Sequence, residues 1–248
     1  NDTEKTMGAC RELKDILELN AMPARIEAFD ISNIQGVLNV GSMIVFEQGK
    51  PNNRNYRRFR IKSVEGANDY ESMREIIERR FVHGLKEREE LEAEEKDFEL
   101  GRFSVFPDMI LLDGGVGQVN AVLPVLRELN INIPVCGMVK DDKHRTRGLI
   151  YNGREIELPK ASKAFRLISA IQEEAHRFAI SYHKSLRSKA TVKSALDDIP
   201  GIGPARRKAL LKSFGSLKNI KKASLEELEK VQGMNRKVAE VVYNFFNS

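Results

Sequence analysis

Three strand-forming stretches follow one another near the start of the chain, and they limit the fold more than any other feature. They read RIEAFDIS (25–32), VGSMIVFEQGK (40–50) and NYRRFRIK (55–62), each with several β-branched or aromatic residues. Gly49 and Pro51, with the asparagines beside them, mark a turn between the last two. This order predicts an antiparallel meander of three strands.

Charge in the third stretch should gather on one face of that sheet. Side chains alternate between the two faces along a strand, so Phe59 and Ile61 share one face. The opposite face then carries Tyr56, Arg58, Arg60 and Lys62. We therefore expect one side of the sheet to be cationic.

The next segment has the spacing of a helix that packs on a core. Its apolar stripe is Tyr70, Met73, Ile76, Ile77 and Phe81. Either Asn68 or Asp69 is expected to cap its first turn. Beyond Gly84 the pattern is charged nearly all round, which indicates an exposed extension or a loop of helical character.

Strand and helix patterns then alternate to about residue 188. An apolar run, a glycine turn and an amphipathic helix occupy 107–130, and another buried strand lies in 133–148. Residues 149–158 predict a hairpin around Asn152-Gly153, and a long amphipathic helix follows from about 162 to 188. The order β-β-β-α-β-α-β-α predicts an α/β fold with a mixed central sheet flanked by helices.

From Thr191 the pattern changes to short helices joined by glycine-containing hairpins. DDIPGIGPARRKALLKSF (197–214) and LEKVQGMNRKVAEVVYNFF (228–246) each contain such a hairpin, followed by a helix that begins with basic residues. This is an internal duplication of a small helical motif. We expect one domain over 1–190 and a small all-α domain over 191–248.

Charge and cysteine usage narrow the partners and the compartment. The net charge is +5, although residues 87–99 collect much of the acid, so the remainder is more cationic than the total. A polyanion such as nucleic acid is one interpretation, and an ordinary basic protein is the other. No leader or bilayer-length apolar run is visible, and Cys10 and Cys136 have no CxxC spacing. These features favour a soluble, cytoplasmic protein without a membrane partner.

Two aspartates stand where a globular fold rarely places acids without a reason. Asp30 lies inside an apolar strand, where an unpaired carboxylate is costly. Asp113 follows MILL and precedes a glycine turn, and ligand sites form beyond the carboxyl ends of strands in open α/β sheets. The alternatives are a structural salt bridge for Asp30 and a helix cap or turn for Asp113.

His176 is a candidate third member of this group. It lies on a polar face of the long helix, with Glu173 one turn away, although a surface histidine is the alternative interpretation. Two carboxylates and one imidazole suit Mg²⁺ or Mn²⁺ better than zinc. Such ions activate water against a phosphodiester, so the deduced chemistry is phosphodiester hydrolysis at a metal bound by Asp30, Asp113 and His176.

The duplicated hairpins indicate binding to a phosphate backbone. Gly201 and Gly203 permit a tight turn, and Asn235 replaces the second glycine as a residue that tolerates a left-handed conformation. Basic residues then open helices whose amide groups can meet phosphates. Paired hairpins of this kind contact a duplex backbone without reading its sequence. The predicted DNA contacts are Arg57, Arg58, Arg60, Lys140, Lys143, Arg145, Arg147, Gly201, Gly203, Arg206, Arg207, Lys208, Gly233, Asn235, Arg236 and Lys237.

Several of these motifs together resemble one family. FDISNIQG, NDYESM, LLDGGVGQVNA, EEAHRFAISYHK and IPGIGPARRKALLKSFGS closely resemble the C-terminal half of the UvrC nucleotide-excision-repair nucleases. The resemblance implies a ribonuclease H-like endonuclease domain followed by a tandem helix-hairpin-helix domain. It also implies incision on the 5′ side of a lesion and cooperation with UvrB bound to damaged double-stranded DNA.

The resemblance also bears on individual residues. It assigns the catalytic group to Asp30, Asp113 and His176, and it adds Asp69, which the residue pattern alone makes a helix cap. Asn33 stands where many relatives are expected to have histidine, and the acidic stretch at 86–99 looks like an insertion. The part of UvrC that carries the GIY-YIG nuclease and the UvrB-binding segment has no counterpart in the chain.

Two other functions remain open from the sequence. One is a catalytically inactive DNA-binding module that recruits repair partners, which predicts salt-sensitive binding that is indifferent to chelators. The other is a nucleotide-dependent enzyme that uses GGVG. That motif is neither a dinucleotide fingerprint nor a Walker loop, and no small-molecule cofactor is expected.

Overall fold

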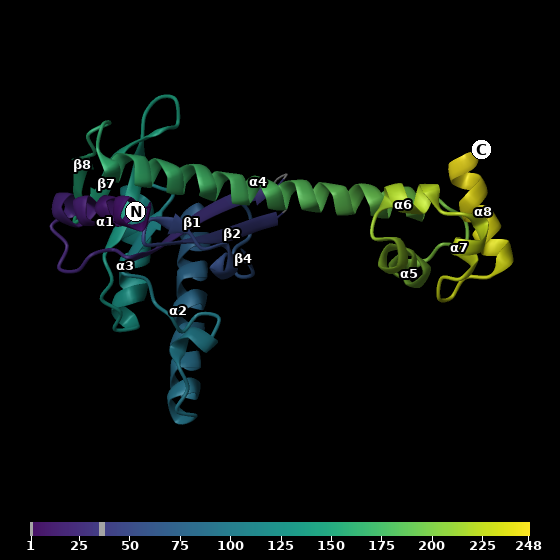
Figure 1. Ribbon diagram of the computed structural model, residues 1–248, viewed down its shortest axis with the longest axis horizontal. Helices are drawn as coiled ribbons and strands as arrows, with labels where there is room; N and C mark the ends of the chain where they lie inside the picture. The colour runs from purple at the N-terminus through teal and green to yellow at the C-terminus, as the bar shows by residue number, and fades with distance from the viewer. Residues whose placement is uncertain (1, 35–37) are drawn as a thin grey trace. The chain divides into compact units, whose positions relative to one another are not determined.

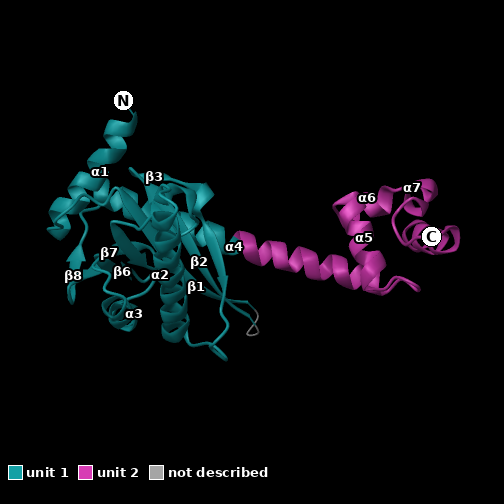
Figure 2. Ribbon diagram, turned by 90° about the horizontal axis from the view of Figure 1, so that it is seen from below, with its two compact units in different colours: residues 1–180 teal, residues 181–248 magenta. Residues whose placement is uncertain are grey.

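The computed structural model describes residues 2–34 and 38–248, and it divides into two compact units (Figures 1 and 2). The first extends to Ile180 and the second begins at Ser181. Helix α4 (Lys163–Asp197) runs through this division and past residue 188, where the sequence pattern ends it. The domain boundary predicted between 190 and 191 lies inside this helix and stays a prediction.

The predicted meander is confirmed in the first unit. Strand β1 (Arg25–Ile34) pairs antiparallel with β2 (Leu38–Glu47), and β2 pairs antiparallel with β4 (Arg57–Arg60). The turn between them holds the two-residue strand β3 (Lys50–Pro51) and a short 3-10 helix, η1 (Asn53–Asn55). Since β1 and β4 both oppose β2, they run in the same direction.

The sheet continues from the other edge of β1 and becomes mixed. Strands β5 (Met109–Leu112) and β6 (Val135–Lys140) run parallel to β1, and β7 (Thr146–Tyr151) and β8 (Arg154–Glu157) complete an eight-stranded sheet. The last two strands form the predicted hairpin, whose turn puts Asn152 and Gly153 at positive φ. The mixed sheet of the predicted α/β class is confirmed.

Helices cover both faces of the sheet (Figure 1). Helices α1 (Asp2–Leu17) and α4 pack on one face in a core that includes Ala28. Helices α2 (Asp69–Ala93) and α3 (Val116–Glu128) pack on the other face in a core that includes Phe29. Alternation along β1 therefore decides which helices each side chain faces.

The charged stretch after Gly84 is helical, since α2 continues to Ala93 before a 3-10 turn, η2 (Phe98–Leu100). Asn68 rather than Asp69 is the N-cap of α2, because its side chain accepts a hydrogen bond from the Glu71 amide. Tyr70 departs from the predicted core-facing stripe, because its residue surface is 54% exposed.

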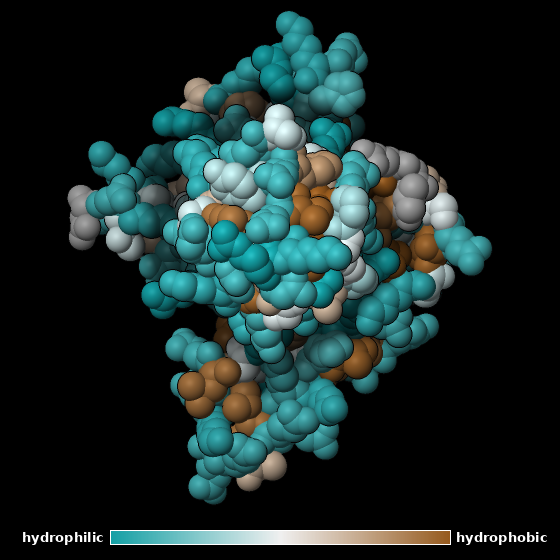
Figure 3. Space-filling view, turned by 90° about the vertical axis from the view of Figure 1, so that its right-hand side faces the viewer, coloured by the Kyte–Doolittle hydropathy of each residue, from teal (hydrophilic) through white to brown (hydrophobic). Residues whose placement is uncertain are grey.

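The second unit has its own hydrophobic core. It contains α5 (Pro204–Phe214), α6 (Leu217–Lys222), α7 (Leu225–Glu229) and α8 (Arg236–Asn247), packed around Leu210 and its apolar neighbours. The face of the molecule in Figure 3 is mostly hydrophilic, with hydrophobic residues in small separate patches. The all-α character predicted for this part of the chain is confirmed.

Two further observations concern the described residues as a whole. None of their helices combines the length and the apolar character needed to cross a bilayer. Cys10 and Cys136 are both buried and form no disulfide.

Candidate active site and nucleic-acid surface

Two parallel strands bring Asp30 and Asp113 together at neighbouring backbone positions. Phe29 of β1 is in register with Leu112 of β5, and the Asp113 amide donates to the Phe29 carbonyl at 2.9 Å. Asp30 and Asp113 each lie two residues beyond a side chain that faces α4, Ala28 and Leu111 respectively. Because side chains alternate along a strand, both aspartates lie on that same face of the sheet. The sequence predicted two carboxylates on neighbouring strand regions, and this geometry agrees with that prediction.

The surroundings of Asp30 favour its neutral form. Burial, together with the charge of Asp113 and a hydrogen bond between the two side chains, raises the pKa of Asp30 to about 8. The Lys140 ammonium and the Ile31 amide oppose this shift only in part. Near neutral pH the pair therefore holds a proton that a bound cation could replace.

Lys140 belongs to this acid pair rather than to an open cationic loop. It is the last residue of β6, the next parallel strand, and its ammonium forms an ion pair with Asp113 Oδ1. The side chains of Lys140 and Asp113 are 31% and 19% exposed. Its predicted role as a DNA contact stays a prediction, but its immediate partner is the carboxylate. The signal available in the sequence was its place at the end of a strand.

His176 lies near the site but does not complete it. It is exposed on α4, one turn beyond Gln172, and Gln172 accepts a hydrogen bond from the Thr146 amide at 2.9 Å. Thr146 is paired with Lys140 across β6 and β7. Among residues 2–34 and 38–248, no three histidine, cysteine or acidic side chains are grouped closely enough to hold a metal ion.

The remaining predicted catalytic residue, Asp69, lies in the first turn of α2 and is exposed. Among the described residues, no hydrogen bond or ion pair links its side chain to Asp30 or Asp113. Its catalytic role, like that of His176, stays a prediction.

The glycine turn after Asp113 packs closely against Gly137 of β6. The Met138 amide donates to the Gly114 carbonyl at 3.1 Å. A Cβ added to Gly137 would lie 2.5 Å from that same carbonyl oxygen. Gly137 therefore lets the turn approach β6, whereas a Cβ on Gly114 would first meet the Gln118 side chain and one on Gly115 would meet nothing within 4 Å. The role predicted for the turn glycines stays a prediction.

The cationic strand β4 presents its arginines to both faces. Arg58 and Arg60 are exposed, and the Arg58 guanidinium lies 4.0 Å from the centre of the Phe178 ring on α4. Arg57 points to the opposite face, where its guanidinium is half-buried 5.8 Å from the Phe103 ring centre. Burial lowers the pKa of Arg57. Only Arg58 and Arg60 therefore share the face on which Asp30 lies.

The loop after β6 neutralises part of its own charge. Arg145 pairs with Asp141 at 3.0 Å, and Arg147 pairs with Glu155 at 2.6 Å. The Lys143 side chain is exposed at the tip of the same loop. This leaves Lys143 as the loop cation most open to a partner.

The first hairpin of the second unit is tied to the second hairpin through Arg206. The Arg206 guanidinium donates to the carbonyls of Gly201 at 2.8 Å and Gly233 at 2.9 Å. Arg207 pairs with Asp197, whereas Lys208 is exposed. Arg206 therefore has a structural contact in addition to its predicted contact with DNA.

The reason predicted for Asn235 is wrong, because neither Asn235 nor Gly203 is left-handed. Their φ angles are −134° and −91°, while Gly201 and Gly233 have the positive values, 84° and 80°. Asn235 instead caps α8, since its side chain accepts from the Val238 amide at 2.9 Å. Arg236 pairs with Glu229 and Glu240, and Lys237 is exposed.

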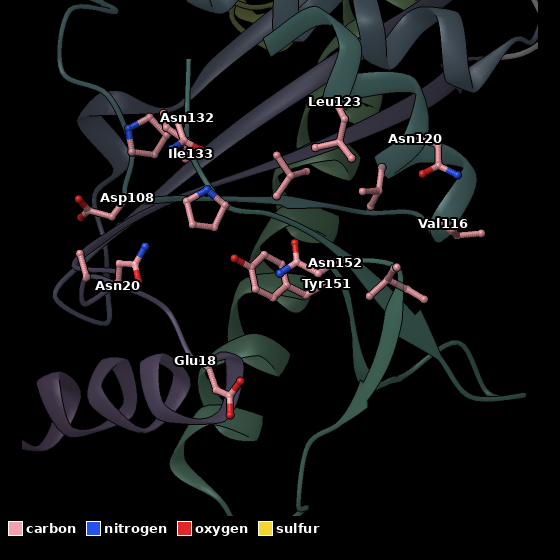
Figure 4. A pocket seen from close by; sticks show the side chains of 17 residues that line it. Glu18, Asn20, Asp108, Val116, Asn120, Leu123, Asn132, Ile133, Tyr151 and Asn152 are labelled. Atoms are coloured by element: carbon pink, nitrogen blue, oxygen red, sulfur yellow. The ribbon is translucent and has the colours of Figure 1, made fainter. Parts of the chain in front are cut away.

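The lining of a cavity of about 470 Å³ (Figure 4) includes neither Asp30 nor Asp113. Its lining includes Asp108 and Pro134, which directly precede β5 and β6, whereas Asp113 follows β5. It extends along α3 and includes Asn120 and Asn152. Ligand sites in such sheets favour the carboxyl edge, so this amino-edge cavity is the weaker candidate for the reaction site.

Two family models account for most of the chain. A model described as "UvrC RNAse H endonuclease domain" matches residues 14–180, and one described as "SAM-like Helix-hairpin-helix tandem" matches 193–246. The chain thus combines a ribonuclease H-like domain of the endonuclease class with a tandem helix-hairpin-helix domain. It belongs to the UvrC family, as the sequence motifs predicted.

Relatives that match the chain over nearly its whole length carry the name "UvrABC system protein C". The chain is 57% identical over 247 residues to the protein of Clostridium novyi (strain NT), covering 100% of this chain and 40% of that protein. It is 56% identical over 246 residues to the protein of Alkaliphilus oremlandii (strain OhILAs), covering 99% and 40%. The chain therefore spans about 40% of the length of these curated relatives.

Similarity to solved structures is weaker. Endonuclease V from Ciona intestinalis, in complex with an inosine-containing 24mer DNA, has a TM-score of 0.31 at 14% identity, covering 48% of this chain and 47% of that one. XPF from Aeropyrum pernix has a TM-score of 0.24 at 18% identity, covering 56% and 60%. At these values neither similarity adds to the functional argument.

Proposed function

We propose that this chain is a divalent-metal-dependent DNA endonuclease that hydrolyses a phosphodiester on the 5′ side of a lesion. The observation that carries the proposal is the pair of Asp30 and Asp113, which β1 and β5 hold at neighbouring backbone positions on one face of the sheet. Membership of the UvrC family supports the reaction class. The single reaction site would lie beside β1, β5 and β6.

The acid pair fits a hard cation. Carboxylate oxygens are the ligands that Mg²⁺ and Mn²⁺ prefer, and neither residue brings a sulfur or nitrogen donor that would favour zinc. When bound, such an ion would polarise the phosphate and lower the pKa of a water nucleophile. Asp30 and Asp113 would hold it, and Asp30 would release its proton on binding.

The other residues of the site have separate roles. Lys140 would hold Asp113 in place and lie within reach of a phosphate oxygen, because its side chain is partly exposed. His176, also exposed, would approach from α4 to complete the ligand set or accept a proton. Asp69 would act from the start of α2, and it ranks below these groups because no contact links it to them.

The second unit would bind duplex DNA through its backbone. In both hairpins the helix that follows has no acid in its first turn, in contrast to α7, which begins with Glu226 and Glu227. Lys208 and Lys237 are exposed in the first turns of α5 and α8. These cations and the helix amides would contact phosphates without reading bases. Binding should therefore weaken steeply with salt.

The proposed biological setting follows from the relatives. A protein similar to "UvrABC system protein C" would act on damaged DNA in a complex with UvrB, in the cytoplasm. The isolated chain would supply the 5′ incision, and the lesion would be selected by its partners.

The test is an incision assay on nicked and lesion-bearing duplex DNA. Wild type, Asp113→Ala and the matched control Asp142→Ala, an exposed loop acid, are compared with Mn²⁺, Mg²⁺ or EDTA. We expect metal-dependent cutting 5′ of the lesion by wild type and the control, and none by Asp113→Ala. Mapping the product ends on a sequencing gel distinguishes the 5′ site from a 3′ site.

One result would favour a catalytically inactive DNA-binding module. It is duplex binding without cleavage under any divalent ion, on free DNA and on DNA preloaded with UvrB. Cleavage by Asp113→Ala equal to that of wild type would instead reject the assignment of the acid pair.

A further inference from the structure

An exposed aromatic side chain lies beside the glycine turn of the acid pair. Tyr70, in the first turn of α2, packs against Gly117 in the first turn of α3. A Cβ added to Gly117 would lie 2.8 Å from Tyr70 Cε1 and 2.9 Å from its hydroxyl oxygen. The absence of a side chain at Gly117 therefore creates the space that this end of the ring occupies.

The starts of α2 and α3 lie at the same edge of the sheet as Asp113. Helix α3 follows directly from Asp113 through Gly114 and Gly115. Strand β4 runs parallel to β1, so it leads toward the same carboxyl edge before α2 begins. The Asn39 side chain, at the edge where β1 ends, donates to the Gly66 carbonyl just before α2.

Distance along the chain limits how far Tyr70 can be from the acids. Gly117 is four residues beyond Asp113, so their Cα atoms are at most roughly 14 Å apart. Successive nucleotides of one DNA strand advance by about 3.4 Å along a duplex. A strand whose phosphate lies at Asp113 therefore places a base near Tyr70 within a few nucleotides of the cut.

Tyr70 is not part of the hydrophobic core. Met73, Ile76 and Ile77 on the same helix are fully buried, whereas 54% of Tyr70 is exposed. An aromatic ring held by one edge and open to solvent on the rest is a stacking surface. Stacking on a base is nearly independent of sequence, because every base has an aromatic face.

We propose that Tyr70 is a positioning residue that stacks on a base, or on the face of an opened base step, next to the scissile phosphate. This inference rests on the proposed endonuclease function and names a contact of that same site. Gly117 acts through Tyr70 by keeping the ring at the start of α3. The contact recognises nucleobases as a class and does not select among them.

The test measures stacking without chemistry. Oligonucleotides carrying 2-aminopurine at each of several positions around the mapped cut are bound with Ca²⁺ in place of Mg²⁺. Stacking on Tyr70 should quench one position in the wild type and in Tyr70→Phe, and the quenching should be lost in Tyr70→Leu. Gly117→Ala, whose Cβ would displace the ring, should shift or remove the same signal.

Steady-state cleavage gives the second readout. Because stacking contributes equally before and during the reaction, Tyr70→Leu should raise KM about tenfold with kcat within about twofold. Tyr70→Phe should restore the wild-type KM. Phe245→Leu, another exposed aromatic at the far end of α8 from Arg236, is the matched control and should change neither value.

The outcomes separate this inference from the proposed function. Equal quenching in wild type and Tyr70→Leu, while both bind and cut DNA, would overturn the stacking role and leave the endonuclease intact. A loss of kcat alone, unrescued by phenylalanine, would also contradict stacking. Failure of the wild type itself to bind or cut DNA would reject the endonuclease.

Discussion

Two acids on β1 differ in their surroundings, and the difference separates a structural role from a chemical one. Glu27 and Asp30 both lie on β1, but they fall on opposite faces of the sheet. Glu27 is fully buried, and both of its carboxylate oxygens accept hydrogen bonds from Arg80, at 2.6 and 2.9 Å. Arg25 adds two more bonds at 3.1 and 3.2 Å. Every charge in this cluster has an opposite charge beside it.

Asp30 is less buried than Glu27 and yet less well satisfied. Its nearest ionisable neighbour is a second carboxylate, and the one ammonium nearby pairs with that neighbour. A fully paired acid has no charge left for a cation to offset, whereas the acid pair would hold one in the proposed function. The structural salt bridge that was one explanation for Asp30 belongs to Glu27 instead.

The largest effect that distinguishes the two acids should appear in catalysis. Asp30→Asn removes one ligand charge, and a bound metal contributes several kcal/mol to transition-state stabilisation. We therefore expect cleavage to fall on the order of 10³-fold. Glu27→Gln should lower the midpoint of urea unfolding and leave the rate of the folded protein near wild type. Single-turnover cleavage rates and urea unfolding curves of both variants provide the measurement. Equal losses of cleavage rate would mean that Glu27 and Asp30 do not differ in their roles.

The next effect concerns the stability of the Glu27 cluster. Arg80 is fully buried, donates to Glu27 and to the carbonyls of Phe103 and Val105, and lies near the rings of Phe81 and Phe106. Arg80→Met would leave a buried carboxylate without its main partner, which costs about 3–5 kcal/mol in the free energy of unfolding.

The neighbouring arginine provides the control for that change. Arg79 pairs with Glu75 near the surface, so Arg79→Met should cost no more than about 1 kcal/mol. Urea unfolding at pH 7 measures both losses. Similar losses for the two variants would mean that the buried cluster contributes little beyond an ordinary surface pair.

The sequence predicted the elements that apolar periodicity determines. The three-strand meander, the Asn152-Gly153 hairpin and the two core-facing helices follow from alternation or helical spacing. Asp30 and Asp113 were also predicted to lie on neighbouring strand regions, because a carboxylate inside an apolar strand is costly unless it is paired or binds a metal.

Side-chain contacts with a neighbouring strand or helix could not be predicted from the sequence. Lys140 was grouped with the loop cations that follow it, since the sequence does not show that β6 lies next to β5. Arg80 has no signal of burial in a helix rich in charge, and Tyr70 fits an apolar stripe that stops one turn short of it. Each is decided by tertiary contacts rather than by local pattern.

A smaller effect is the pH dependence of the acid pair. The pKa of Asp30 in the folded protein, about 8, lies above its ordinary value of 3.8. The stability contributed by its proton is therefore full below about pH 4 and is lost as pH rises through about 8. Without divalent ions, the wild-type melting temperature should fall across this window more than that of Asp30→Asn.

Metal affinity should depend on pH over the same window, but it should rise with pH where the stability falls. Binding must displace the proton of Asp30, so Mn²⁺ affinity should rise about tenfold per pH unit up to about pH 8 and then level off. Titration calorimetry in buffers of different ionisation enthalpy counts the proton released. Binding that releases no proton at pH 7 would contradict the raised pKa of Asp30.

The smallest effect should come from Lys140, whose contact with Asp113 is partly open to solvent. Lys140→Met removes the cation that offsets the two carboxyl groups, and an ion pair of this exposure contributes at most about 1 kcal/mol to the free energy of unfolding. A saturating divalent ion supplies the same positive charge, so Mn²⁺ should restore the loss in the variant. Melting temperatures with and without Mn²⁺, beside the control Lys143→Met, measure this. If the loss of stability persists under saturating Mn²⁺, Lys140 supports the site through packing rather than through its charge. The acid pair then does not need a cation, and this difference from Glu27 disappears.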